Sequence, residues 1–166
     1  MEEILKRRSV RDFLDKEVEN EKIEQLLRAA MAAPTAANQR EWEFIVVTDK
    51  TLIEKLSVST PYSKPVAKAP LAIVMLGNFK KTIFPDCWQQ DLGACAENIL
   101  LDAVHLGLGG VWLAVAPSED RMQAITDIFS LPEEVKPFSI IALGYPREDA
   151  ATRDRYEQDK VHYNSY

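Results

Sequence analysis

The chain has 166 residues, of which 46% are hydrophobic and 28% are charged, and its formal net charge is -6. This composition is that of an ordinary globular domain, and it excludes a disordered, collagenous or coiled-coil protein. The length predicts a single domain over residues 1–166. The acidic net charge argues against general nucleic-acid binding, which needs a basic surface.

The sequence does not favour a membrane or secreted protein. Every apolar run is shorter than the ~18 residues that span a membrane, so we expect no membrane partner. The first eight residues contain acids and lack the apolar segment of a secretory signal. Cys87 and Cys95 are too few for a disulfide framework or a four-cysteine metal site. We therefore expect a soluble cytoplasmic protein without a metal.

The first half of the chain predicts one helix and two strands. Apolar residues at helical spacing predict a helix over 20–32, with Asn20 as a plausible N-cap and Pro34 ending it. A β-branched run predicts a strand over 44–47. The unbroken apolar run over 71–76 indicates a strand buried on both faces.

The second half predicts a longer helix, then strand, helix and strand. Residues 91–108 are apolar nearly all round, which indicates a helix buried in a core or in a subunit interface. Glycines at 107, 109 and 110 are expected to close it as a turn. A strand over 111–115, a helix over 119–129 with Ser118 as its N-cap, and a strand within 137–145 follow. The fold class is α+β, a central mixed or antiparallel sheet of about four strands flanked by about five helices.

No acid–base or nucleophilic constellation is evident. The glycines at 107–110 lie between a helix and a strand, whereas a dinucleotide-binding loop lies between a strand and a helix. His105 is expected in the core or an interface, and Cys95 is expected to be an inert mid-helix thiol. Asp86 and Asp91 form no convincing carboxylate pair at readable spacing. The chain is therefore either a binding module or a protein in which a cofactor supplies the reaction.

Two basic clusters stand out in this acidic chain. Lys6, Arg7, Arg8 and Arg11 surround Ser9, while Arg153, Arg155 and Lys160 lie near the other end. Both clusters can be solvated faces, or they can hold a small anion between them. The charge pattern alone leaves the two alternatives open.

Four segments, in chain order, resemble the motifs of the nitroreductase family of FMN-dependent oxidoreductases. Lys6–Phe13 is similar to the family's Arg-Arg-Ser-x-Arg-x-Phe motif, and residues 33–44 resemble its Pro-[Ser/Thr]-x-x-Asn segment. Gly110–Pro117 resembles its Val-Trp-x-Gly strand, and 141–146 with the tail resembles its C-terminal signature. The resemblance covers nearly the whole chain.

The resemblance implies which residues contact FMN. Arg7, Arg8 and Ser9 would meet the phosphate and ribityl chain, and Arg11 would lie near the pyrimidine edge of the ring. Guanidinium groups suit this role because they bind phosphate bidentately and stay charged. A segment with Pro34, Thr35, Ala36 and Asn38 would reach the flavin across the subunit boundary. A strand with Trp112, Leu113 and Ala114 would lie along one flavin face. The tail arginines Arg153 and Arg155 would meet the phosphate.

The resemblance also implies a homodimer with two FMN sites at its interface. The long helix from Asp91 is the candidate dimer core, and the tail 146–166 is expected to wrap the partner subunit. NADH or NADPH would give a hydride to flavin N5, and a nitroaromatic, quinone or similar small acceptor would then take its place, in ping-pong order. The flavin performs this chemistry, so no catalytic side chain is expected, although Arg11 can tune the flavin. The alternatives are a non-catalytic FMN-binding or sensing protein, and another flavin chemistry such as reductive dehalogenation or flavin breakdown.

The chain departs from the family motifs at a few positions. Arg40 and Glu41 stand where the family has Gln-Pro, and Ala114 stands where it usually has Gly. Arg153 replaces the more frequent Lys. The substrate pocket is expected near residues 60–69 and around 84–88, without assignment to particular side chains. The choice between NADH and NADPH stays open.

Overall fold

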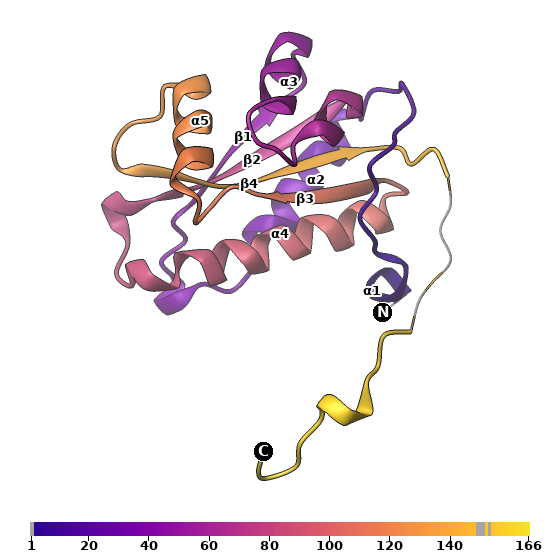
Figure 1. Ribbon diagram of the computed structural model, residues 1–166, viewed down its shortest axis with the longest axis vertical. Helices are drawn as coiled ribbons and strands as arrows, with labels where there is room; N and C mark the ends of the chain where they lie inside the picture. Colours follow the sequence, from indigo (N-terminus) through magenta and orange to yellow (C-terminus); the bar gives the residue numbers. More distant parts are fainter. Residues whose placement is uncertain (1, 149–151, 153) are drawn as a thin grey trace.

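A computed structural model describes residues 2–148, 152 and 154–166 (Figure 1). Arg153, one of the two tail arginines predicted to meet the phosphate, lies outside the described residues. The other twelve predicted contact residues lie within them.

Four strands form one antiparallel sheet. They are β1 (Trp42–Val47), β2 (Leu71–Asn78), β3 (Gly109–Ala114) and β4 (Val135–Gly144), in the spatial order β1-β2-β4-β3. Each neighbouring pair is antiparallel, with Trp42 opposite Gly77, Ile73 opposite Ile141, and Trp112 opposite Ile141 on the other side of β4. The α+β prediction is confirmed, in its antiparallel form. β3 is an edge strand, which leaves one of its sides open to other parts of the molecule.

Helices cover both faces of the sheet (Figure 1). The α-helices are α1 (Glu2–Lys6), α2 (Asn20–Met31), α3 (Lys50–Ser57), α4 (Trp88–His105) and α5 (Glu119–Phe129). Short 3₁₀ turns are η1 (Ala36–Asn38), η2 (Lys64–Lys68), η3 (Phe79–Lys81), η4 (Pro85–Cys87) and η5 (Gln158–Lys160). The helices α2 and α4 pack against one face, and α3 and α5 pack against the other.

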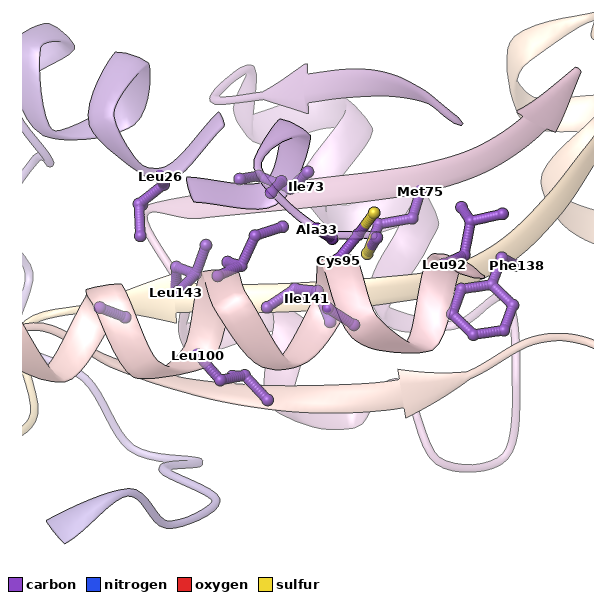
Figure 2. Packing of buried hydrophobic residues seen from close by; sticks show 14 of the residues in the cluster. Leu26, Ala33, Ile73, Met75, Leu92, Cys95, Leu100, Phe138, Ile141 and Leu143 are labelled. Carbon is purple, nitrogen blue, oxygen red and sulfur yellow. The ribbon is translucent and has the colours of Figure 1, made fainter. Parts of the chain in front are cut away.

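The strand β2 shows why the sheet has a core on each side. Its residues Leu71, Ile73 and Met75 belong to the cluster under α2 and α4, and the residues between them belong to the cluster under α3 and α5. Side chains alternate between the two faces of a strand, so an unbroken apolar run is buried on both. Figure 2 shows the first cluster, in which Cys95 of α4 lies near Met75. The prediction of a strand buried on both faces is confirmed.

Several predicted boundaries are wrong. The N-cap of α2 is Glu19, and Asn20 is the first helical residue. The helix α4 runs from Trp88 to His105 rather than over 91–108. Gly107 alone has the left-handed backbone of a turn, with φ of 72°, whereas Gly109 and Gly110 belong to β3. The predicted bounds of α5 and its N-cap at Ser118 are confirmed.

The tail after β4 differs from the rest of the chain. Residues 154–166 are exposed throughout, and Figure 1 shows the C-terminal end running away from the sheet. An extended segment without a packed face is what a partner-wrapping tail would look like in a single chain, and the wrapping itself stays a prediction. In the described part of the chain, no helix is long and apolar enough to cross a membrane.

Candidate functional site

The N-terminal basic segment lies along the open edge of β3. Ser9 forms a parallel bridge with Gly110, and the Val10 N–H donates to the Gly110 carbonyl oxygen at 2.9 Å. A Cβ on Gly109 would lie 2.6 Å from Val10 Cγ2, closer than two carbon atoms can pack. Glycine therefore suits position 109 because the Val10 side chain of the basic segment packs directly against its Cα. Gly109 and Gly110 are strand residues because they pair with Gly144 and Leu143 of β4.

The three predicted arginines of this segment differ in how they are held. Arg7 is half-buried, with Nε 3.2 Å from Glu97 Oε1 on α4. Arg8 is half-buried and donates to the Glu148 carbonyl oxygen at 2.6 Å. Arg11 is exposed, and its one hydrogen bond in the described structure reaches the Ser9 carbonyl oxygen at 3.5 Å, the outer limit for such a bond. Three guanidinium groups and an exposed Ser9 hydroxyl thus lie within five consecutive residues, a donor set that fits a phosphate.

The segment 34–40 is a strained turn attached to the N-terminal end of α4. Ala37, Asn38 and Arg40 have φ of 49°, 54° and 49°, in the left-handed region that L-residues rarely adopt. The Ala36 N–H donates to both Asp91 oxygens, at 3.1 and 3.0 Å, and the Arg40 N–H donates to Thr35 Oγ1 at 3.1 Å. Strained backbone of this kind persists only where its surroundings hold it, and it is concentrated at functional sites.

Two carboxyl groups and an amide lie beneath this turn. Gln39 Nε2 donates to Glu41 Oε1 at 3.1 Å and to Asp91 Oδ2 at 2.9 Å. Glu41 and Asp91 are 3% and 7% exposed. Burial raises the pKa of Glu41, and the neighbouring Asp91 carboxylate raises it further. Asp91 thus has a carboxyl neighbour, Glu41, at a separation of 50 positions that gives no readable spacing in the sequence. The only signal in the sequence was the unusual Glu41, since the two residues are far apart along the chain.

The third predicted group lies on β3 beyond the Ser9 bridge. Trp112 is half-buried and packs edge to face on Phe138, with ring centroids 5.6 Å apart. Leu113 is buried, while Ala114 is exposed and its carbonyl oxygen accepts from Arg121 Nη1 at 3.2 Å. Trp112 and Leu113 thus serve the core, and of the three residues only Ala114 is exposed.

The helix α4 connects the first two groups. Arg7 contacts it at Glu97 and Ala36 contacts it at Asp91, which are six positions and therefore about 9 Å apart along a helix axis. Pro34 and Asn38 are exposed beside them, and Thr35 is half-buried. Arg155 is exposed in the tail, and among the described residues no hydrogen bond or ion pair links it to the N-terminal segment. The predicted meeting of the two basic clusters is thus untested.

The other residues singled out in the sequence, a cysteine, a histidine and two aromatic residues, lie partly in the core and partly on the surface. Cys95 is buried, and burial raises the pKa of its thiol to about 12, so it is neutral. His105 is not a core residue, since its side chain is exposed with Nδ1 3.6 Å from Glu3 Oε1. In the expected pocket region Trp88 is buried against Phe79 and Phe138, whereas Phe84 is 50% exposed.

Comparison with known proteins identifies the family of the chain. The model of the nitroreductase family matches residues 4–72 and 58–145. Since these ranges cover most of the chain, the protein belongs to the nitroreductase family.

Similar proteins match this chain over most of their length. A protein of Methanothermobacter thermautotrophicus, provisionally named an NADH dehydrogenase/NAD(P)H nitroreductase, is 43% identical over 100% of this chain and 87% of its own. The crystal structure of a provisionally named NADH oxidase from Clostridium acetobutylicum has a TM-score of 0.97 and 45% identity, covering 99% of both chains. An FMN-dependent nitroreductase from Clostridium difficile has a TM-score of 0.92 and 34% identity, covering 100% of both chains.

Proposed function

We propose that the protein is an FMN-dependent oxidoreductase that takes electrons from NADH or NADPH and delivers them to a small electron-poor acceptor, such as a nitroaromatic or a quinone. The observation that supports this most is the cationic segment Arg7–Arg11 fixed along the edge strand β3, in a chain whose net charge is -6. Family membership supports the same cofactor, because a similar protein of known structure is FMN-dependent.

The residues present fit FMN. Its phosphate would be held by Arg7, Arg8 and the Ser9 hydroxyl, which suit a group carrying a charge of about -1.5 to -2. Arg7 and Arg8 are already fixed by Glu97 and the Glu148 carbonyl, so little side-chain freedom would be lost on binding. Arg11, which is the more exposed, would place a positive charge near the pyrimidine edge of the ring.

When bound, FMN supplies the hydride transfer itself, accepting from NAD(P)H and giving to the acceptor in turn. The chain's own residues bind and orient it. The strained turn at 36–38 offers small and exposed residues that a ring could approach, and Ala114 offers an exposed surface on β3. A fixed guanidinium near the ring would favour its reduced form, because that form gains negative charge.

The proposal includes a homodimer in which α4 forms part of the interface, 34–38 reaches the partner's flavin, and the tail wraps the partner. An exposed tail over 154–166 and exposed Ile4 and Leu5 on α1 support it. Burying such apolar side chains against a second copy is a usual source of dimer stability. A cytoplasmic location stays a prediction.

The visible spectrum of the purified protein, before and after anaerobic addition of NADH or NADPH, tests the function. We expect a flavin spectrum that bleaches with at least one nucleotide, and the faster donor identifies the preference. A flavin spectrum that persists with both would favour a sensing or other flavin role. A colourless protein that takes up no added FMN would refute the proposal.

A further inference from the structure

Glu41 and Asp91 form a carboxyl pair inside the protein. Glu41 Oε1 and Asp91 Oδ2 share the Gln39 amide as donor, at 3.1 and 2.9 Å. Asp91 Oδ1 and Oδ2 both accept from the Ala36 N–H. Glu41 Oε2 is buried and has no hydrogen-bond partner among the described residues. Gln39 and the Ala36 N–H hold the pair from outside, and one of its four oxygens, Glu41 Oε2, has no partner among the described residues.

No positive charge compensates the pair. Within the described residues, neither carboxyl forms an ion pair with a lysine, arginine or histidine. Two adjacent buried carboxylates without a cation are strongly disfavoured, and such pairs hold a proton instead. Burial raises the pKa of Glu41, and the charge and hydrogen bond of the Asp91 carboxylate raise it further, so Glu41 is the member of the pair that holds the proton.

We propose that Glu41, in its neutral form, is a positioning residue that with Gln39 and Asp91 holds the turn 36–38 in the conformation required at the flavin site. This inference rests on the proposed function. The turn has left-handed backbone at Ala37 and Asn38 and depends on Asp91 for the Ala36 contact. Loss of the Glu41 proton would place two like charges under the turn and weaken its attachment.

The same network reaches a second part of the site. Gln39 Oε1 accepts from the N–H groups of Ile83 and Phe84, at 3.0 and 2.9 Å. The apolar residues Ile83 and Phe84 are 63% and 50% exposed, and they lie in the region where the sequence predicts the substrate pocket. One amide therefore ties the flavin-facing turn to an apolar surface, and the charge state of Glu41 bears on both.

The direction of the pH effect follows from the surroundings. Asp91 on α4 and Cys95 one helical turn further along are the titratable groups facing Glu41, and the Cys95 thiol is neutral because burial raises its pKa to about 12. Burial first and Asp91 second raise the pKa of Glu41 above its ordinary 4.5. Its contribution to stability is therefore complete at pH below about 4.5 and is lost as pH rises through the folded-state pKa.

The test compares the wild type with Glu41→Gln, whose amide mimics the neutral carboxyl. FMN affinity is measured by flavin fluorescence, and thermal unfolding of the FMN-free protein is followed from pH 5 to 9. We expect the wild-type Kd for FMN to rise with pH by up to about tenfold per pH unit across the transition, and Glu41→Gln to flatten both profiles. Glu43→Gln, an exposed glutamate on β1, is the matched control and should keep the wild-type profiles.

Coincident wild-type and Glu41→Gln profiles in both measurements would overturn the inference. If Glu41→Gln does not fold, the infrared band of a protonated carboxyl in the wild type decides, because it should persist above pH 4.5, where an ordinary glutamic acid ionises, and be lost at high pH. Absence of that band above pH 4.5 would also overturn it. If the wild type binds no FMN at any pH, the proposed function fails, while the unfolding profiles still report whether Glu41 holds a proton.

Discussion

Arg11→Ala separates a cofactor-binding residue from a solvated surface charge. Arg11 is exposed, and its hydrogen bond to the Ser9 carbonyl at 3.5 Å is at the outer limit. Removing it should change the free energy of unfolding of the FMN-free protein by less than about 0.5 kcal/mol. A charge-assisted hydrogen bond to FMN contributes about 1.5–3 kcal/mol, and exposure places Arg11 at the lower end. We therefore expect about a tenfold weaker Kd for FMN.

Two assays check the size and origin of this effect. Fluorescence titration gives the Kd for FMN, and the difference between the variant and the wild type should shrink at 1 M salt, where the Debye length is about 3 Å. The two-electron potential of the bound flavin should fall by about 20–45 mV if the guanidinium stabilises the reduced form by about 1–2 kcal/mol.

Arg28→Ala is the matched control. Arg28 is an exposed arginine on α2 that pairs with Glu24, so its loss changes the net charge equally without touching the proposed site. It should leave the Kd for FMN and the potential unchanged. An Arg11→Ala protein with wild-type affinity and wild-type potential would show that the Arg11 charge is merely solvated.

Three further predictions concern the edge strand, the thiols and the assembly. Gly109→Ala should destabilise the protein by about 1–3 kcal/mol and weaken FMN binding, because the new Cβ would lie 2.6 Å from Val10 Cγ2. Gly93→Ala is the control, since its new Cβ would meet no atom nearer than 3.6 Å. Urea unfolding of the two variants measures the difference in stability. Alkylation at pH 8 should modify the half-buried Cys87 in the folded protein, whereas Cys95, whose pKa burial raises to about 12, should react only after urea is added. Rapid labelling of both cysteines without urea would contradict this. Light scattering at micromolar concentration should give a dimer, and a monomer that still binds FMN would exclude the shared site.

The parts of the fold that were predictable have a strong local pattern. The run over 71–76 is apolar without a break because both of its faces are covered, and α5 begins directly after Ser118, which occupies the predicted N-cap position. The start of β3 was not predictable. Gly109 and Gly110 are small because Val10 and Leu143 press against them, and these contacts join residues that are far apart in the sequence.

The same distinction applies to the candidate site. The spacing of Arg7, Ser9 and Arg11 marked the basic segment, but its position along β3 depends on tertiary packing. The Glu41–Asp91 pair had no readable spacing, because Gln39 and the strained turn bring two distant elements together. The replacement of Pro by Glu at 41 was visible as a departure from the family motif, but its partner was not.

The position of β3 at the sheet edge has a consequence for solubility. An uncovered edge strand presents unpaired backbone groups to which other chains can add, and this is a common start of aggregation. The N-terminal segment covers this edge at Gly110, and Arg121 covers the carbonyl of Ala114. The stretch between them is the part expected to face the flavin. Protein expressed in flavin-poor cells should therefore aggregate more readily than protein supplied with FMN, and the cofactor would protect the chain that binds it.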